Sequence, residues 1–374
     1  MPKYNLLIDT NIYRKCPGRD DLAFKALERL CKEGVLKLYL PYVVEREFQT
    51  QQIDVYKKEF DLVSKGIDGL LRKKQAPKQM RQIETIKTKL DAIKEPTLAQ
   101  VNAALPKWIE SIGGSKLPLT KKDAQAAMEA YFLGKPPLTV AKEREDIPDA
   151  FIFQNISQLA RNHVPLVVIA EDGKVFNASA ALDGVRAYKS LAEFIELPDI
   201  QDEILELDVV DNLSALRVAF KNQESESGEV AYLMEHHVGQ KLYGRTVHSR
   251  TIPDDNNEGT ITSYWHPTDL ALDYDELHYF GNGEFGLPFK FDMTVSITYY
   301  IFKSDFYLMD EEKMPSVSDH NDHYFEAESE IDIHVEGLVK LSIDPALVKE
   351  VSAEVIEENL EASIDSIDNV TVIE

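Results

Sequence analysis

A short apolar segment near the start of the chain, residues 5–8, is followed at once by an aspartate. A run this short and this apolar is typical of a strand buried on both faces of a parallel sheet. Residues 21–33 then carry leucine and alanine at helical spacing, Gly34 suits a helix end, and residues 35–40 form a second apolar run before Pro41. Strand, helix and strand, with a helix expected from Pro41, predict a parallel α/β sheet.

The alternation of strands and helices then stops for about a hundred residues. From Val43 to about Ile112 the sequence keeps a helical period, which Gln75-Ala76-Pro77 should divide into two helices. Residues 57–94 contain 11 Lys and Arg against 5 Asp and Glu, a local balance of +6. We therefore expect a basic, helical insertion at about residues 50–135, with a loop at residues 113–115.

The alternation resumes after this insertion with another predicted helix. Residues 164–170 and 185–188 are predicted as two further strands, and Ser190 as the cap of a closing helix. The pattern ends at Pro198. Residues 1–198 are therefore predicted to form the first domain, a parallel sheet flanked by helices.

The second half of the chain differs in charge and in pattern. The chain has 374 residues and a formal charge of −24, which divides into +4 for residues 1–200 and −28 for residues 201–374. The whole-chain charge would disfavour a nucleic-acid partner, but almost all of it comes from the second half. Residues 326–343 alternate acidic and apolar side chains, which predicts an antiparallel sheet with one exposed face. We expect an acidic α+β domain at residues 199–374, ending in weak helix and an edge strand at residues 370–373.

Other features exclude whole classes of protein. The two cysteines, Cys16 and Cys31, are too few for a disulfide scaffold. The start of the chain has no signal-peptide pattern, and its apolar runs are far shorter than the ~20 residues that a membrane span needs. These observations predict a soluble, cytoplasmic protein without a membrane partner.

The residues that suggest chemistry are carboxylates at strand ends and helix starts: Asp9, Glu45 or Glu47, Asp149 and Asp172. In open α/β sheets, ligands bind at the carboxyl ends of the strands. Four converging acids would repel one another unless a cation neutralised them, and oxygen-only ligands favour Mg²⁺ or Mn²⁺. A single Asp at a helix start is more often a cap, so the case depends on the combination.

The same segments resemble the motifs of the PIN-domain nucleases, and in particular of larger bacterial PIN-like proteins with a helical insertion and an extra C-terminal domain. The motifs are Leu6–Asn11, Leu40–Phe48, Ile147–Ile152, Val167–Phe176 and Ser190–Phe194, and the resemblance covers about residues 3–198 without the insertion. Its second motif favours Glu47 over Glu45. One departure is Ala170, where the family commonly has Thr or Ser.

The resemblance implies a PIN-like fold and a divalent-metal-dependent nuclease, most often an endoribonuclease, in toxin-like or phage-defence biology. The expected metal ligands are Asp9, Glu47, Asp149 and Asp172, which with Asn11 are the expected catalytic residues. Bound Mg²⁺ or Mn²⁺ would activate water for attack on a phosphodiester. The candidate substrate-binding residues are Thr10, Lys73, Lys74, Lys142 and Arg144, although Lys142 and Arg144 also suit an ordinary solvated loop.

Two other functions stay open at this stage. In one, the first domain is a catalytically silent scaffold and the acidic second domain is the working part. In the other, the same carboxylates belong to a phosphatase that acts on a small substrate. The basic insertion argues for a longer polyanion. The resemblance implies that RNA is a better expectation than DNA. The acidic domain is a candidate surface for a protein partner or a second copy, or a device that excludes nucleic acid.

Overall fold

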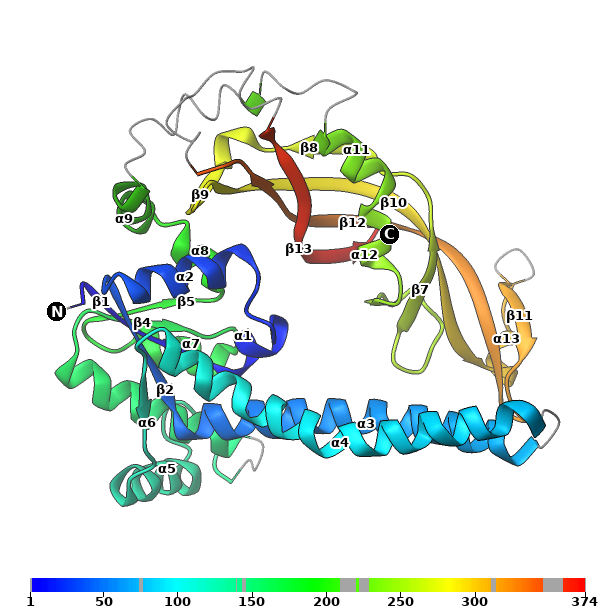
Figure 1. Cartoon of the computed structure of the whole chain (residues 1–374), viewed down its shortest axis with the longest axis horizontal. Coiled ribbons are helices and arrows are strands. Elements are labelled where there is room, and N and C mark those ends of the chain that lie inside the picture. Colours follow the sequence, from blue (N-terminus) through cyan, green and yellow to red (C-terminus); the bar gives the residue numbers. More distant parts are fainter. Residues whose placement is uncertain are drawn as a thin grey trace. The chain divides into compact units, whose positions relative to one another are not determined.

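The computed structural model divides into two compact units, Met1–Leu197 and Pro198–Glu374 (Figure 1). It describes residues 2–73, 77–138, 140–142, 146–208, 220–221, 229–310, 314–345 and 359–373. Among these residues, no helix is both long and apolar enough to cross a membrane.

The first unit is built on a parallel sheet, as the apolar runs predict. Within the described residues it has five strands in the order β3-β2-β1-β4-β5, and every neighbouring pair is parallel. The strands are β1 (Tyr4–Ile8), β2 (Leu36–Pro41), β3 (Ser115–Leu117), β4 (Leu166–Ile169) and β5 (Val185–Tyr188). Residues 6–8 and 166–169 are completely buried, because β1 and β4 are central strands with helices on both faces.

Two details of this sheet differ from the sequence-based expectation. Residues 113–115 were expected to be a loop, but Ser115 begins the edge strand β3, which pairs with residues 39–41 of β2. Pro41 is the last residue of β2, and the following helix begins at Tyr42 instead. An edge strand of three residues has too little apolar sequence to be seen by periodicity.

Short helices cover the sheet and begin at polar caps. They are α1 (Thr10–Lys15), α2 (Leu22–Lys32), α5 (Lys121–Leu133), α6 (Ile147–Asn162), α7 (Gly173–Ala180) and α8 (Leu191–Ile195). Asp9 caps α1, Asp172 caps α7, and Ser190 caps α8 with its hydroxyl 3.1 Å from the Glu193 N–H. A strand that ends on a helix cap places the capping side chain at the carboxyl edge of the sheet.

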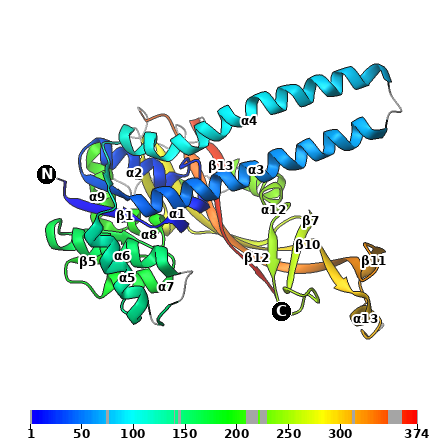
Figure 2. The same cartoon turned by 90° about the horizontal axis from the view of Figure 1, so that it is seen from below.

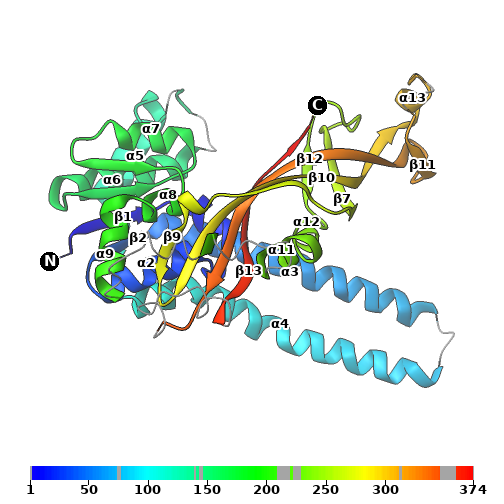
Figure 3. The same cartoon turned by 90° about the horizontal axis from the view of Figure 1, so that it is seen from above.

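The insertion forms an antiparallel hairpin of two long helices, α3 (Tyr42–Lys73) and α4 (Pro77–Ser111). Figures 2 and 3 show the pair side by side, extending away from the sheet of the first unit; we call it the arm. Asp61 pairs with Lys94 at 2.7 Å and Asp68 pairs with Lys87, so ion pairs connect the two helices along their length.

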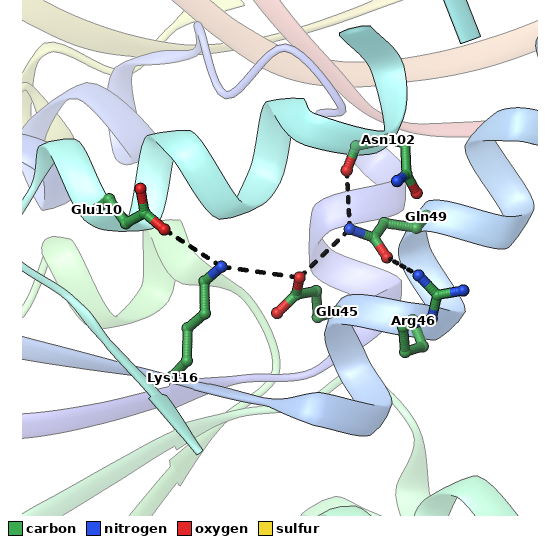
Figure 4. Close-up of polar contacts among 6 residues, drawn as sticks. All are labelled: Glu45, Arg46, Gln49, Asn102, Glu110 and Lys116. Carbon is green, nitrogen blue, oxygen red and sulfur yellow. Dashed lines mark hydrogen bonds and ion pairs between the residues drawn. The ribbon is translucent and has the colours of Figure 1, made fainter. Parts of the chain in front are cut away.

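The base of the arm is held by a buried glutamine (Figure 4). Pro106 lies inside α4 and has no N–H, so the Asn102 carbonyl, four residues earlier, lacks its helical donor. The Gln49 amide of α3, 3% exposed, donates to that carbonyl at 2.8 Å. It also donates to Glu45 at 3.3 Å and accepts from Arg46 at 2.8 Å. Gln49 therefore joins α3 to α4 where α4 would otherwise have an unpaired carbonyl.

The second unit is an antiparallel sheet whose described strands number eight. They are β6 (Thr246–His248), β7 (Glu258–Tyr264), β8 (Thr268–Leu272), β9 (His278–Gly281), β10 (Glu284–Phe302), β11 (Ser316–Asp319), β12 (Tyr324–Ser342) and β13 (Glu361–Val372). The described helices of this unit are α9 (Pro198–Asp208), α11 (Glu229–His236), α12 (Val238–Leu242), the 3₁₀ turn η2 (Tyr274–Glu276) and α13 (Lys303–Phe306).

The long pair β10 and β12 forms the centre of this sheet, in register from Glu284–Ser342 to Phe302–Tyr324. The acids Glu328, Glu330 and Asp332 are exposed, whereas Ile333 and Val335 are buried, as the alternation predicts. The prediction for the end of the chain was wrong in extent: residues 361–369 belong to strand β13, which pairs with β12, and are not helix.

We expect Gln49→Leu to lower the free energy of unfolding by about 2 kcal/mol, because the buried Asn102 carbonyl loses its donor. Pro106→Ala restores a backbone N–H to that carbonyl. The Gln49→Leu cost should therefore fall by about 1 kcal/mol in the Pro106→Ala background. Urea unfolding of the four proteins in this double-mutant cycle measures the coupling. Equal Gln49→Leu costs in both backgrounds would contradict the assignment.

Candidate active site

Two aspartates follow the paired central strands of the parallel sheet. Asp9 comes directly after β1, is 3% exposed, and accepts a hydrogen bond from the Thr10 N–H at 2.8 Å. Asp172 is three residues after the end of β4 and accepts from the N–H groups of Lys174 and Val175 at 2.7 and 3.3 Å. Each carboxylate is oriented by the start of a helix, and both lie at the carboxyl edge of neighbouring strands.

Asp149 lies in the first turn of α6. The pKa of its carboxyl group is raised to about 7, chiefly by burial and then by the negative charges of Asp172, Asp9, Asp146 and Glu47, in that order of importance. A carboxyl group with this pKa is only partly ionised at neutral pH. These charges lie on α3 and at the starts of α1, α6 and α7, so the ends of these helices lie close to Asp149.

Asp9 experiences the same group of charges. Its pKa is raised to about 6: burial raises it most, the Thr10 N–H lowers it, and the charges of Glu47, Asp172 and Glu171 raise it by smaller amounts. The charges of Glu47 and Asp172 act on both Asp9 and Asp149, and the charge of Asp9 also acts on Asp149, so these interactions connect all four sequence-predicted acids.

The structure distinguishes Glu47 from Glu45. Glu47 accepts a hydrogen bond from the Thr10 hydroxyl at 2.8 Å, beside Asp9. Glu45, two residues earlier on α3, contacts the Gln49 amide at 3.3 Å and the Lys116 ammonium at 3.9 Å (Figure 4). Residues two apart on a helix point in nearly opposite directions, so only Glu47 joins the group around Asp9, while Glu45 supports the base of the arm.

Two polar neighbours extend this group. Thr10 is 2% exposed, and its hydroxyl connects α1 to Glu47 on α3. The Asn11 side chain is half-buried and accepts from Arg14 at 3.3 Å. Ala170 is fully buried at the end of β4 and offers no hydroxyl at the position where the resemblance leads one to expect it.

Sequence reasoning missed a second, paired layer of charge. Asp146 is 7% exposed and accepts from the Lys174 ammonium at 2.6 Å. Asp146 is three residues before Asp149, and Lys174 is two residues after Asp172. The i, i+3 spacing of the two aspartates, which places them on one helix face, was the available signal. Lys174 therefore forms a direct ion pair with an acid whose charge acts on Asp149.

The other sequence-predicted cations lie elsewhere. Lys142 is exposed, and its own backbone N–H donates to the Tyr131 carbonyl at 2.9 Å. It is not among the groups named above as causes of the raised pKa of Asp149. Lys73 is exposed at the far end of α3, 26 residues after Glu47, which corresponds to roughly 40 Å along the helix. Lys74 and Arg144 lie outside the described residues.

The donor chemistry of the four acids suits a hard divalent cation. All four offer carboxylate oxygens, which are preferred by Mg²⁺ and Mn²⁺, and the charges of the others contribute to the raised pKa values of Asp9 and Asp149. Over the described part of the chain, no three His, Cys, Asp or Glu side chains are close enough to enclose an ion. The fit therefore rests on donor type and mutual repulsion, and not on a closed cage.

Comparison with known families agrees with this geometry. Residues 6–176 match the sequence model of the PIN domain, a range that spans β1 to the middle of α7 and includes all four acids. Comparisons with curated proteins and with solved structures gave no match. PIN domains are generally nucleases, and PIN nucleases bind nucleic acid and generally use divalent metals such as Mg²⁺ or Mn²⁺. Residues 6–176 of the N-terminal unit are therefore similar to the PIN domain, whose members are generally nucleases.

Proposed function

We propose that this chain is a divalent-metal-dependent endonuclease that cleaves RNA, acting in toxin-like or phage-defence biology. The observation that carries the metal-dependent reaction is the electrostatic coupling of Asp9, Glu47, Asp149 and Asp172 at one sheet edge. The preference for RNA and the biological setting rest on the resemblance to PIN-domain nucleases. A catalytically silent scaffold would gain no stability from holding four carboxylates that repel one another in this arrangement.

Each residue has a proposed task in this reaction. Asp9, Glu47, Asp149 and Asp172 hold the metal, which supplies charge neutralisation at the phosphate and lowers the pKa of bound water. Asp9 and Asp172 are held in place by the helix starts that they cap.

The neighbouring polar groups have positioning tasks. The Thr10 hydroxyl orients Glu47 through their 2.8 Å hydrogen bond. Asn11 is next to Thr10 at the start of α1 and is proposed to position the scissile phosphate. The Lys174 ammonium offsets the charge of Asp146, so that this buried acid does not compete with the four ligands.

The arm offers a path for a longer substrate. Lys58, Lys65 and Arg72 are exposed and follow one another on α3 at intervals of seven residues, so they form one basic row along the helix. No salt bridge to a described residue neutralises any of the three. We therefore assign non-specific phosphate binding to this row, together with Lys73 and Lys74 near its end.

Glu47→Gln should abolish metal-dependent cleavage of labelled RNA, whereas Glu45→Gln should retain it. Both substitutions remove one carboxylate from the same helix, but only Glu47 faces Asp9 through Thr10. Loss of a metal ligand removes several kcal/mol of transition-state stabilisation, so we expect a decrease in rate of about 100-fold or more. Initial rates with Mg²⁺ and with Mn²⁺ measure it.

Asp149→Asn is the second variant to be tested in this experiment, and it should lose cleavage as Glu47→Gln does. Residual activity of Glu47→Gln and Asp149→Asn at the wild-type level would refute the assignment. Cleavage of a small phosphomonoester panel, but not of RNA or DNA, would favour a phosphatase that uses the same acids.

Asp9→Asn should stabilise the metal-free protein at neutral pH. The pKa of Asp9 is about 6 in the folded state against 3.8 for the ordinary group, so its ionisation opposes folding as pH rises from about 4 to 6. Asparagine removes the charge and keeps a capping oxygen. We expect a gain of about 1–3 kcal/mol at pH 7.5, shrinking to about half at pH 5.

Bound metal should reverse the order of stability of the wild type and Asp9→Asn. Mn²⁺ should raise the melting temperature of the wild type and have little effect on Asp9→Asn, because a ligand that binds only the folded state stabilises it. Asp183→Asn, at an exposed acid, is the control and should change neither value. A wild type that Mn²⁺ leaves unchanged would support the catalytically silent scaffold.

The triple substitution Lys58→Gln, Lys65→Gln and Arg72→Gln should weaken the binding of long single-stranded RNA. It should also lower the slope of log affinity against log salt by about 2, at roughly 0.7 for each lost phosphate contact. Cleavage of a short oligonucleotide that cannot reach the arm should not change. Lys121→Gln with Lys122→Gln, both exposed outside the arm, serves as the control. An unchanged salt slope would remove the arm from the substrate path.

A further inference from the structure

The arm has a row of exposed apolar side chains along one side. Tyr56, Val63 and Leu70 of α3 are spaced by seven residues and are 41%, 47% and 54% exposed. Ile86 and Ile93 of α4 are also seven residues apart and are 56% and 54% exposed. Side chains at this spacing lie on one side of a helix. We call these five residues the apolar row.

A different row makes the contact between the two helices. On α3 this inner row is Ile53, Phe60 and Ile67, which are partly or fully buried and precede the members of the apolar row by three residues. Together the two rows give the alternating spacing of three and four residues that is typical of a coiled coil. The hairpin itself covers only the inner row, so half of the heptad pattern has no partner within the arm.

The ion pairs show that the apolar row lies on one face of the arm. Asp61 and Asp68, which pair with α4, are each two residues before a member of the apolar row and so point almost opposite to it. Their partners Lys87 and Lys94 also flank the contact on the side away from Ile86 and Ile93. Since the ion pairs close one edge of the contact, both helices direct the apolar row to the other edge.

Two glycines of α3 have no packing partner among the described residues. Gly66 and Gly69 lie in the interior of a long helix, where glycine is destabilising relative to alanine. A Cβ atom at either position would meet no heavy atom within 4 Å. A glycine in such a place is useful where another backbone approaches closely.

The charges around Gly66 indicate what approaches. Glu59 and Lys73 are each seven residues from Gly66 on this side of the helix, one before it and one after it. An antiparallel pairing of α3 with a second α3, centred on Gly66, sets Glu59 of each copy opposite Lys73 of the other. The same pairing sets Leu62 opposite Leu70 and Val63 opposite Gly69. The helix is thus complementary to itself in charge and in size.

We propose that the arm is a dimerisation surface and that its occupant is the arm of a second copy of this chain, with the two α3 helices antiparallel about Gly66. The contact is isologous, as in most homodimers, and buries the apolar row in a four-helix bundle. The basic residues Lys58, Lys65 and Arg72 are each two residues after a member of the apolar row. They therefore face outward in the dimer and stay available to phosphates.

Sedimentation of the full chain tests the surface. The wild type should have twice the 42.4 kDa mass of the chain, and Val63→Glu with Leu70→Glu should have the mass of one chain. Leu119→Glu, which places a carboxylate on an exposed apolar residue outside the arm, should stay dimeric. A monomeric wild type at the highest soluble concentration, or a double variant that still dimerises, would overturn the proposal. This result does not depend on nuclease activity.

Charge reversal tests the partner and the register. Glu59→Lys and Lys73→Glu should each weaken the dimer by about tenfold, because each places two like-charge pairs across the twofold axis. The double variant should recover the wild-type dissociation constant within about threefold.

A cysteine placed on the twofold axis gives an independent readout. Gly66→Cys should form a disulfide between two copies on oxidation, whereas Lys65→Cys, on the outer side of the helix, should not. If the double charge reversal does not recover the dimer and Gly66→Cys does not cross-link, a pairing centred on Gly66 is wrong.

Discussion

The repulsion among four carboxylates is the constraint around which the first unit is organised. Asp9, Glu47, Asp149 and Asp172 come from four different elements, and two of them have pKa values of about 6 and 7 because they are buried near one another. Holding such a group requires a rigid frame. The completely buried strands β1 and β4 provide it, and the helix caps at Asp9 and Asp172 direct the side chains to the same edge. The core therefore stabilises an arrangement that the site itself disfavours.

Much of this unit could be predicted because its signals are local. The apolar runs before Asp9 and Asp172 mark central strands, and a cap at the end of a strand places its side chain at the carboxyl edge. What the sequence could not supply was pairing between distant residues. Gln49 completes the hydrogen bonding of a carbonyl that Pro106 leaves open, 53 residues away, and neither residue indicates the other. The choice between Glu45 and Glu47 likewise depended on what each side chain contacts.

The errors in the second unit and at the sheet edge have a common cause. Strand β3 has three residues and lies at an edge, and β13 carries acids at Asp365 and Asp368, so neither has the apolar content that marks a buried strand. Both are strands because a neighbour offers hydrogen bonds, β2 for the first and β12 for the second. Pairing of this kind is set by the tertiary structure and overrides local propensity.

The arm shows how one helix can serve three purposes without conflict. Its inner row packs against α4, its apolar row follows three residues after the inner row, and Lys58, Lys65 and Arg72 follow two residues after the apolar row. Each step turns the side chain to a different side of the helix, so these three rows occupy separate faces, and Lys73 is the one residue assigned both to pairing with a second copy and to phosphate binding. The net charge of −24 is a poor guide to such a molecule. At physiological salt a charge acts over about 8 Å. Acidic side chains farther than this from Lys58, Lys65 and Arg72 therefore have little effect on the potential along that basic row.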